Sequence, residues 1–289
     1  MFDEKRPTVS FEVFPPKKDY PIETIYDTIE SLKDLDPDFI SVTYGAGGST
    51  QNNTIEIASR IKNHYGIESI AHLTCISSSR ETIRTTIETL KASGVENILA
   101  LRGDIPEALV KSGFKPAYPH TVDLIEEIKK SRYFSIGGAA YPEGHVESLS
   151  RTSDIKYLKS KVDHGLDFLI TQLFFDNRKF YQFKESLDLL DIKVPVIAGI
   201  FPVVNLRQIN HVQALTGTRL PSKFSRIIDR YQDKPEALRE AGIAYAVNQI
   251  IDLLSSGVDG IHLYTMNQPM NTRKIMEPIT TIRKTLTQK

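Results

Sequence analysis

The sequence predicts an α/β fold, a (β/α)8 TIM barrel with an extra short helix between strands 7 and 8. Eight short segments are apolar on both faces and rich in β-branched residues, as buried parallel strands are. Segments with apolar residues at helical spacing separate them. No composition shift or low-complexity linker interrupts the 289 residues, so residues 1–289 are expected to form one domain. A doubly wound open sheet is the alternative, because strand order cannot be read from one sequence.

Each expected strand stops where turn-forming or polar residues begin. The first, over 9–14, is ended by Pro15-Pro16, since proline donates no backbone hydrogen bond. The second leads into the glycine-rich residues 45–48. In chain order, the expected strands are 9–14, 38–44, 69–74, 97–101, 133–140, 167–174, 194–200 and 260–264.

The expected helices alternate with these strands. Residues 22–35 carry an apolar residue every three or four positions, and Ser79 can cap the helix over 79–92. The other helices are expected around 55–61 and 122–128, and over 153–164, 180–190, 235–256 and 273–286. Between strands 7 and 8, residues 205–233 predict two short helices around Thr216-Gly217, ahead of the long helix.

Composition limits the functional classes. Lys+Arg and Asp+Glu both total 36, so no basic excess would attract nucleic acid or a membrane surface. Cys75 is the only cysteine, which excludes an intramolecular disulfide and a cysteine-based zinc site. The charged start of the chain lacks a signal peptide's apolar region, and no apolar run approaches the ~20 residues of a membrane span. We expect a soluble, cytoplasmic protein without a metal site, since the His residues lack metal-ligand spacing.

Polar and ionisable residues gather near the ends of six consecutive expected strands. They are Glu12, Thr43, Tyr44, His72, Thr74, Arg102, Asp104, Tyr141, His145 and Gln172. The N-terminal ends of the strands are plainer. Because active sites of such barrels lie at the C-terminal ends of the strands, this one-ended pattern predicts a pocket there.

Glu12 is the most informative of these residues, because an unpaired charge inside an apolar strand is costly. We expect it to serve chemistry; the alternative is a structural glutamate paired with Lys or Arg. His72 has a second interpretation as a hydrogen-bonded core histidine. Asp154, Tyr157 and Lys161 share one helix face, which spacing alone assigns to solvent.

Seven motifs follow one another along essentially the whole chain. They are FEVFPP at 11–16, SVTYGA at 41–46, HLTC at 72–75, LRGD at 101–104, AYPEGH at 140–145, ITQLFFD at 170–176 and HLYTMN at 262–267. Together they resemble the 5,10-methylenetetrahydrofolate reductase family, in its catalytic domain alone and at bacterial-type length. The resemblance implies an FAD-binding barrel in one-carbon metabolism and methionine biosynthesis. Hydride would pass from NADH or NADPH through FAD to methylenetetrahydrofolate, giving 5-methyltetrahydrofolate.

The resemblance also implies roles for single residues. Glu12 would be the general acid that protonates the leaving N10 of the folate, and burial among aromatic residues should favour its neutral form. Asp104 would contact both pterin and flavin, with Gln172 and Gln208 as further folate contacts. The flavin site would comprise Thr43, Tyr44, Ala46, His72, Arg102, Gly103, Asp104, Tyr141, His145, Asp154 and Lys161, with Arg102 and Lys161 neutralising the diphosphate.

Four positions depart from the better-studied bacterial relatives. Val212 replaces a phenylalanine that helps to hold the folate and the nicotinamide, and Gln268 replaces an arginine near the folate glutamate tail. Tyr157 and Ser160 replace polar or basic residues. Val212 raises the alternative that a partner protein, a flavoprotein or a ferredoxin-like protein, supplies the electrons. A folate-binding or regulatory protein without turnover is a further alternative. The sequence leaves NADH and NADPH both open, and the family implies a homo-oligomer.

Overall fold

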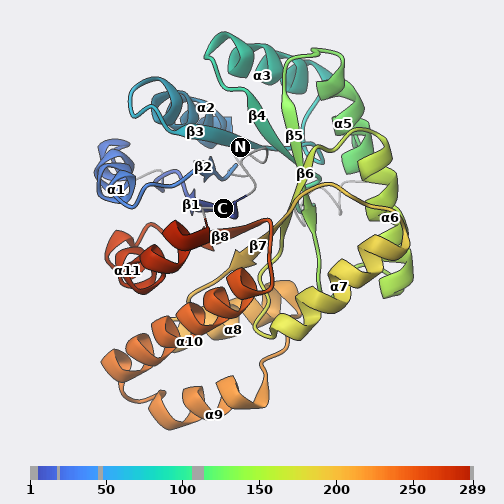
Figure 1. The fold of residues 1–289 in the computed structure, drawn as a ribbon. Coiled ribbons are helices and arrows are strands. Elements are labelled where there is room, and N and C mark those ends of the chain that lie inside the picture. Colours follow the sequence, from blue (N-terminus) through green and yellow to red (C-terminus); the bar gives the residue numbers. More distant parts are fainter. Residues whose placement is uncertain (1–5, 18–19, 45–47, 106–113, 287–289) are drawn as a thin grey trace.

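The computed structural model describes residues 6–17, 20–44, 48–105 and 114–286. Within them, eight parallel strands follow one another around the sheet in chain order, and the last strand pairs with the first. Helices surround the strands on the outside (Figure 1). The closed order confirms the TIM barrel and excludes the open doubly wound sheet.

The strands are β1 (Thr8–Val13), β2 (Phe39–Val42), β3 (Glu68–Thr74), β4 (Asn97–Leu101), β5 (Ser135–Ala140), β6 (Phe168–Thr171), β7 (Val196–Ile200) and β8 (Gly260–Tyr264). All eight coincide with expected strands, but β2 ends at Val42, before the predicted Thr43 and Tyr44, and β6 is also shorter than predicted. β6 ends at Thr171, so Gln172 follows the strand instead of belonging to it. The reason is local: the next N–H, that of Leu173, bonds the side-chain oxygen of Gln172 at 2.9 Å and leaves the sheet.

The helices are α1 (Glu23–Lys33), α2 (Gly48–Asn63), α3 (Arg80–Ala92), α5 (Thr121–Lys129), α6 (Arg151–Asp163), α7 (Asn177–Leu189), α8 (Leu206–Thr216), α9 (Ser222–Tyr231), α10 (Pro235–Ser255) and α11 (Pro269–Leu286). Ser79 caps α3 as predicted, accepting the N–H of Thr82 at 3.0 Å. Gly217, with φ of 65°, ends α8. The short helices α8 and α9 precede α10 and gather with it on one side of the barrel, which confirms the extra helix between β7 and β8 (Figure 1).

Two apolar layers explain which side chains face the interior. Inside the barrel, Phe39, Ile70, Leu99, Phe168, Ile170 and Ile197 form one cluster. Val9, Phe11 and Val13 of β1 belong instead to the larger cluster between the strands and the helices. Since side chains alternate along a strand, Ser10 and Glu12 face the interior. The same alternation holds in β8. Ile261 and Leu263 belong to the outer cluster, so His262 and Tyr264 face the interior.

We call the N-terminal ends of the strands the floor, and there the prediction of plain strand ends was wrong. In three places an aspartate just before one strand accepts a backbone N–H at the start of the preceding strand. The pairs are Asp38 with Val9 at 2.6 Å, Asp167 with Ile136 at 2.7 Å and Asp259 with Val196 at 2.9 Å. Hydrogen bonds to a charged acceptor are the stronger kind, so these aspartates tie neighbouring strands together.

Candidate active site

We call the opposite end of the barrel the mouth, and Glu12 lies there, near the C-terminal end of β1 and only 7% exposed. Its carboxylate Oε2 lies 3.6 Å from Nε2 of both His72 and His262. None of the ion pairs found among the described residues joins Glu12 to Lys or Arg. The structure therefore does not support the alternative of a glutamate paired with a cation.

His262 in β8 is fully buried and joins β1 and β2 through hydrogen bonds. The hydroxyl of Ser10 donates to the carbonyl of Ile261 at 3.2 Å and lies 2.7 Å from His262 Nδ1. Nε2 of the same ring lies 3.3 Å from the Ser41 hydroxyl. The two serines therefore hold the His262 ring in place beside Glu12.

Sequence reasoning did not include His262 among the site residues. The available signal was its position, because β8 pairs with β1 and His262 alternates with two outward-facing apolar residues. A buried histidine on the strand next to Glu12, and on the same side of the sheet, belongs to the same site.

His72 in β3 is the second imidazole beside Glu12 and is 7% exposed. Burial lowers the pKa of His72 from 6.5 to about 4, against an opposing effect from the Glu12 charge. The ring is therefore neutral at pH 7. Its Nε2 is buried without a hydrogen-bond partner in the part of the chain that the structure describes. A core histidine would be hydrogen-bonded, so this atom fits contact with a ligand better.

Tyr264 borders the interior next to Glu12, its register partner across the β1–β8 pair. Its hydroxyl donates to the carbonyl of Thr171 at 2.8 Å, and burial raises its pKa well above 10. Gly199 in β7 makes this bond possible. A Cβ at that position would lie 2.2 Å from the Thr171 carbonyl oxygen and 2.9 Å from the tyrosine ring. Any larger residue would displace the wall of the mouth.

Arg102 lies just after β4 and forms a two-point ion pair. Its Nη1 and Nη2 donate to the two carboxylate oxygens of Glu147 at 2.6 and 2.9 Å. The Glu147 side chain is 58% exposed, so this pair contributes little stability and can exchange with another anion. Nearby, Tyr141 meets the ring of His145 edge-on at 4.6 Å between centroids, and burial raises the pKa of Tyr141 to about 12.

The α6 face shared by Asp154, Tyr157 and Lys161 is only partly solvated: Tyr157 is exposed, but Lys161 is buried, contrary to the interpretation from spacing alone. Lys161 is 6% exposed and donates Nζ to the carbonyl of Ala139 in β5 at 2.7 Å. Burial lowers the pKa of Lys161 to about 8, opposed by the charge of Asp154. The Asp154 carboxylate accepts from Ser148 at 3.2 Å and from the His145 N–H at 3.3 Å. It therefore shapes the loop after β5.

Gln172 directly follows β6, and Gln208 lies in the first turn of α8, after β7. The side-chain oxygen of Gln172 accepts the N–H of Leu173 at 2.9 Å, and that of Gln208 accepts the N–H of Val204 at 2.9 Å. Neither NH2 group has a hydrogen-bond acceptor within the described part of the chain, so each can donate to a ligand.

The two positions that depart from bacterial relatives on the substrate side are both engaged within the protein. Val212 is 6% exposed and packs in a cluster with Leu173, Phe201 and Phe224. Its side chain is thus part of the core under α8 and α9. The side-chain oxygen of Gln268 accepts from Asn271 at 2.5 Å.

The remaining predicted residues also follow strand ends at the mouth. Thr43 and Tyr44 come directly after β2, and burial raises the pKa of Tyr44. Gly103 has φ of 82°, and a Cβ there would lie 3.0 Å from Thr74, so the turn after β4 needs glycine. Asp104 beside it is exposed, unlike the buried Glu12. Ala46 lies outside the described residues.

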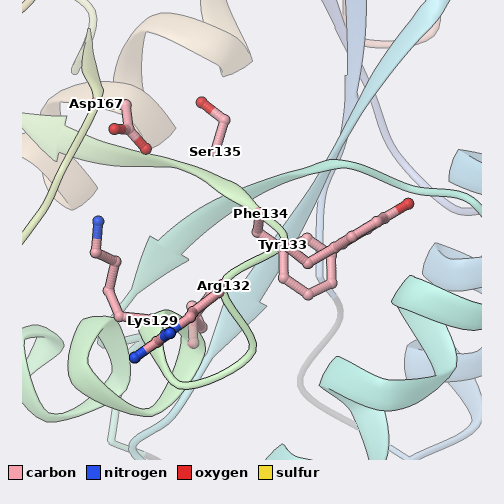
Figure 2. A pocket seen from close by; sticks show the side chains of 7 residues that line it. Lys129, Arg132, Tyr133, Phe134, Ser135 and Asp167 are labelled. Atoms are coloured by element: carbon pink, nitrogen blue, oxygen red, sulfur yellow. The ribbon is translucent and has the colours of Figure 1, made fainter.

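A surface depression of about 430 Å³ lies at the other end of the barrel, beside the starts of β5 and β6. Figure 2 shows Lys129 and Arg132 on one side of it, with Ser135 and Asp167 on the other. The site at the mouth is therefore defined by its side-chain chemistry and not by this hollow.

The described ranges also lack two kinds of feature. No helix there is long and apolar enough to cross a membrane. Nor do those residues include a group of three or more His, Cys, Asp or Glu side chains arranged to hold a metal ion.

A closed parallel barrel with a buried carboxyl and two buried imidazoles toward the C-terminal strand ends defines an enzyme-type TIM barrel. A family model described as methylenetetrahydrofolate reductase matches residues 1–280. The chain belongs to the methylenetetrahydrofolate reductase family.

Relatives from bacteria and plants share about a third of the sequence. The chain is 37% identical over 263 residues to a 5,10-methylenetetrahydrofolate reductase of Pectobacterium carotovorum subsp. carotovorum, covering 91% of this chain and 87% of that protein. It is 36% identical over 260 residues to the Escherichia coli (strain K12) protein of the same name, covering 90% and 86%. It is 35% identical over 278 residues to methylenetetrahydrofolate reductase (NADH) 1 of Zea mays, covering 91% and 46%. The chain thus spans about half the length of this plant relative.

Solved structures resemble the chain in fold alone. An uncharacterised Clostridium thermocellum protein, described as binding two copies of 5-methyl-5,6,7,8-tetrahydrofolic acid, aligns with a TM-score of 0.68 at 15% identity, covering 98% of this chain and 97% of that one. A dihydropteroate synthase of Coxiella burnetii in complex with pteroic acid aligns with a TM-score of 0.53 at 14% identity, covering 97% and 94%.

Proposed function

We propose that this protein reduces 5,10-methylenetetrahydrofolate to 5-methyltetrahydrofolate, with FAD as its cofactor and NADH or NADPH as the hydride donor. The observation that carries this proposal is the buried Glu12 carboxyl, which has no Lys or Arg partner among the described residues of a chain in this family. The one-carbon unit accepts hydride only after its five-membered ring opens, and opening needs a proton on N10. Glu12 is the group that delivers it.

Two features of the mouth support a bound flavin. The Nε2 atom of His72 is buried without a partner in the described structure, and Arg102 and Lys161 bring cations to one side. When bound, FAD would supply the ring that carries hydride from the donor to the folate. The residues proposed to hold it are Thr43, Tyr44, Ala46, His72, Arg102, Gly103, Asp104, Tyr141, His145, Asp154 and Lys161.

The folate would be oriented by Asp104, Gln172 and Gln208. An exposed carboxylate can accept hydrogen bonds from the pterin 2-amino and ring N–H groups and can stabilise the developing iminium charge. The free NH2 groups of the two glutamines suit the carbonyl acceptors of the pterin.

A second candidate concerns the electron source. Val212 is packed into the apolar cluster below α8 and α9, so it does not offer the aromatic face that a nicotinamide would stack on. The second candidate is therefore a reductase that receives its electrons from a partner protein and carries out the same folate chemistry at Glu12.

The test starts with the purified protein and added FAD. We expect a flavin absorption spectrum, anaerobic bleaching by NADH or NADPH, and turnover with methylenetetrahydrofolate. Vigorous turnover with either nicotinamide alone excludes an obligatory partner protein. A colourless protein that neither binds FAD nor reduces the folate, even with a chemical reductant as electron source, would refute the proposal.

A further inference from the structure

The loop after β8 grips the backbone on both sides of Val13, just where β1 ends. The Thr265 hydroxyl donates to the carbonyl of Glu12 at 2.6 Å. The Asn267 side chain binds the backbone of Phe14 twice, accepting its N–H at 2.9 Å and donating to its carbonyl at 2.9 Å. In addition, the N–H of Asn267 donates to the Thr265 hydroxyl at 3.2 Å, which joins the two contacts. We call Thr265 and Asn267 the β8 clasp.

We propose that the β8 clasp positions the Glu12 carboxyl for proton transfer, so that Thr265 and Asn267 are positioning residues for the reaction. This inference rests on the proposed function, because it assigns the clasp a role in delivering the Glu12 proton.

The need for such a device follows from the surroundings of Glu12. Its carboxylate oxygen lies 3.6 Å from each imidazole, beyond hydrogen-bond length, so neither ring fixes the side chain directly. The backbone of Glu12 therefore determines where the carboxyl lies. The chain beyond it turns away through Pro15-Pro16, which cannot donate backbone hydrogen bonds to a neighbour. The clasp instead holds the Glu12 carbonyl and both backbone groups of Phe14, the last residue before these prolines.

The clasp is itself held in an uncommon conformation. Met266 and Asn267 both have φ of 53°, in the left-handed region that costs most residues about 1 kcal/mol or more. Asparagine tolerates this region better than most residues. Two consecutive residues of this kind aim the Asn267 amide back at Phe14. Thr265 is also only 2% exposed, so its hydroxyl is committed to the clasp and not to solvent.

The positive φ of Asn267 allows its side chain to be removed without straining the backbone. Asn267→Gly removes the amide but keeps a residue that adopts positive φ freely, so backbone strain is not added. Thr265→Val keeps the shape and removes the hydroxyl, whereas Thr265→Ser retains it. Thr280→Val is the matched control, because Thr280 makes the same kind of bond, to the carbonyl of Met276 at 2.9 Å, on α11.

Two measurements test the proposal. The first is hydrogen exchange of the Phe14 amide in the flavin-free protein. We expect exchange to be about tenfold faster or more in Asn267→Gly and unchanged in Thr280→Val. The second is stopped-flow kinetics of the FAD-loaded protein. In Asn267→Gly and Thr265→Val, oxidation of the reduced flavin by methylenetetrahydrofolate should slow ~10- to 100-fold, because a displacement of about 1 Å has effects of this size. Reduction by the nicotinamide should change less than about threefold, and Thr265→Ser should be close to wild type.

The outcomes separate the two proposals. Unchanged Phe14 exchange in Asn267→Gly, or equal slowing of both half-reactions, overturns the clasp as a positioning device. A wild-type protein that binds FAD but reduces no folate contradicts the proposed function and with it the catalytic role of the clasp. In that case the exchange measurement still decides whether the clasp holds the end of β1.

Discussion

The mouth and the floor of the barrel use the same kinds of polar residue in opposite ways. At the floor, Asp38 accepts the N–H of Val9 and is paired with Arg6 at 2.7 Å and Arg283 at 3.0 Å. At the mouth, the Glu12 carboxylate has no cation among the described residues, and Nε2 of His72 has no partner there. Burial alone therefore does not mark a functional group, and neither does a single unpaired atom, since Ser69 Oγ at the start of β3 is also buried without a partner among the described residues. The mouth differs because its unpaired imidazole atom lies 3.6 Å from a buried carboxylate.

The physical reason lies in the cost of burial. A buried polar atom that loses water without gaining a hydrogen bond destabilises the fold by about 1–3 kcal/mol. The three aspartates of the floor avoid that cost with carboxylate-to-backbone bonds, whereas Nε2 of His72 at the mouth retains it. A site that must accept a ligand and move a proton needs atoms that the protein does not satisfy itself.

The largest expected effect is that of Glu12→Gln at the mouth. Gln cannot deliver a proton, so we expect oxidation of the reduced flavin by methylenetetrahydrofolate to slow about 1,000-fold, while reduction by the nicotinamide stays within about threefold. The free energy of unfolding should not fall, because no cation loses its partner. Stopped-flow spectroscopy and urea titration measure the two quantities. Equal losses in both half-reactions would remove Glu12 from its assigned role.

The next effect concerns acid sensitivity at the mouth. The pKa of His72 is about 4 in the folded protein against 6.5 for the free side chain, so the unfolded chain binds more protons between these values. Stability contributed by the neutral ring is complete above pH 6.5 and is lost as pH falls towards 4, by about 3 kcal/mol in total. His72→Gln should flatten this part of the stability curve in urea titrations of the flavin-free protein. His64→Gln, at an exposed position, is the control and should leave the curve unchanged.

At the floor, Asp38→Asn should lower the free energy of unfolding by about 2 kcal/mol, since the half-buried Arg6 and the buried Arg283 lose a charged partner. Both half-reactions per folded molecule should stay at wild-type rates. Asp36→Asn is the matched control: its side chain is 96% exposed and lies 3.8 Å from the same Arg283. Its effect should be below about 0.5 kcal/mol. Slower half-reactions per folded molecule in Asp38→Asn would contradict the purely structural role assigned to the floor.

The smallest expected effect is that of Glu147→Gln at the exposed edge of the mouth. Its pair with Arg102 is solvent-exposed, so the free energy of unfolding should change by less than about 1 kcal/mol. Because Arg102 is then free for the FAD diphosphate, fluorescence titration should show binding of FAD tightened by about two- to fivefold. Weaker FAD binding would mean that Glu147 helps to place Arg102 for the cofactor.

The strands and the position of Glu12 could be predicted from the sequence, because the spacing of apolar residues and the residues that end a strand are local properties. The apolar run over 9–14 and the Pro15-Pro16 stop identified Glu12 and its strand. The shortened β6 could not be foreseen, since a side-chain bond of Gln172 ends it. Burial of Lys161 and the aspartates of the floor also escaped, because their partners lie on other strands and helices. Long-range hydrogen bonds decide these features, and spacing along the chain does not record them.

The central claim is that the mouth reduces methylenetetrahydrofolate with hydride held on a bound flavin. The most direct measurement is a single turnover without any nicotinamide: the FAD-loaded protein is photoreduced anaerobically, mixed with methylenetetrahydrofolate, and the products are quantified. We predict 5-methyltetrahydrofolate stoichiometric with the flavin that is reoxidised in the wild-type protein. Flavin that stays reduced, with no 5-methyltetrahydrofolate formed, would contradict the account.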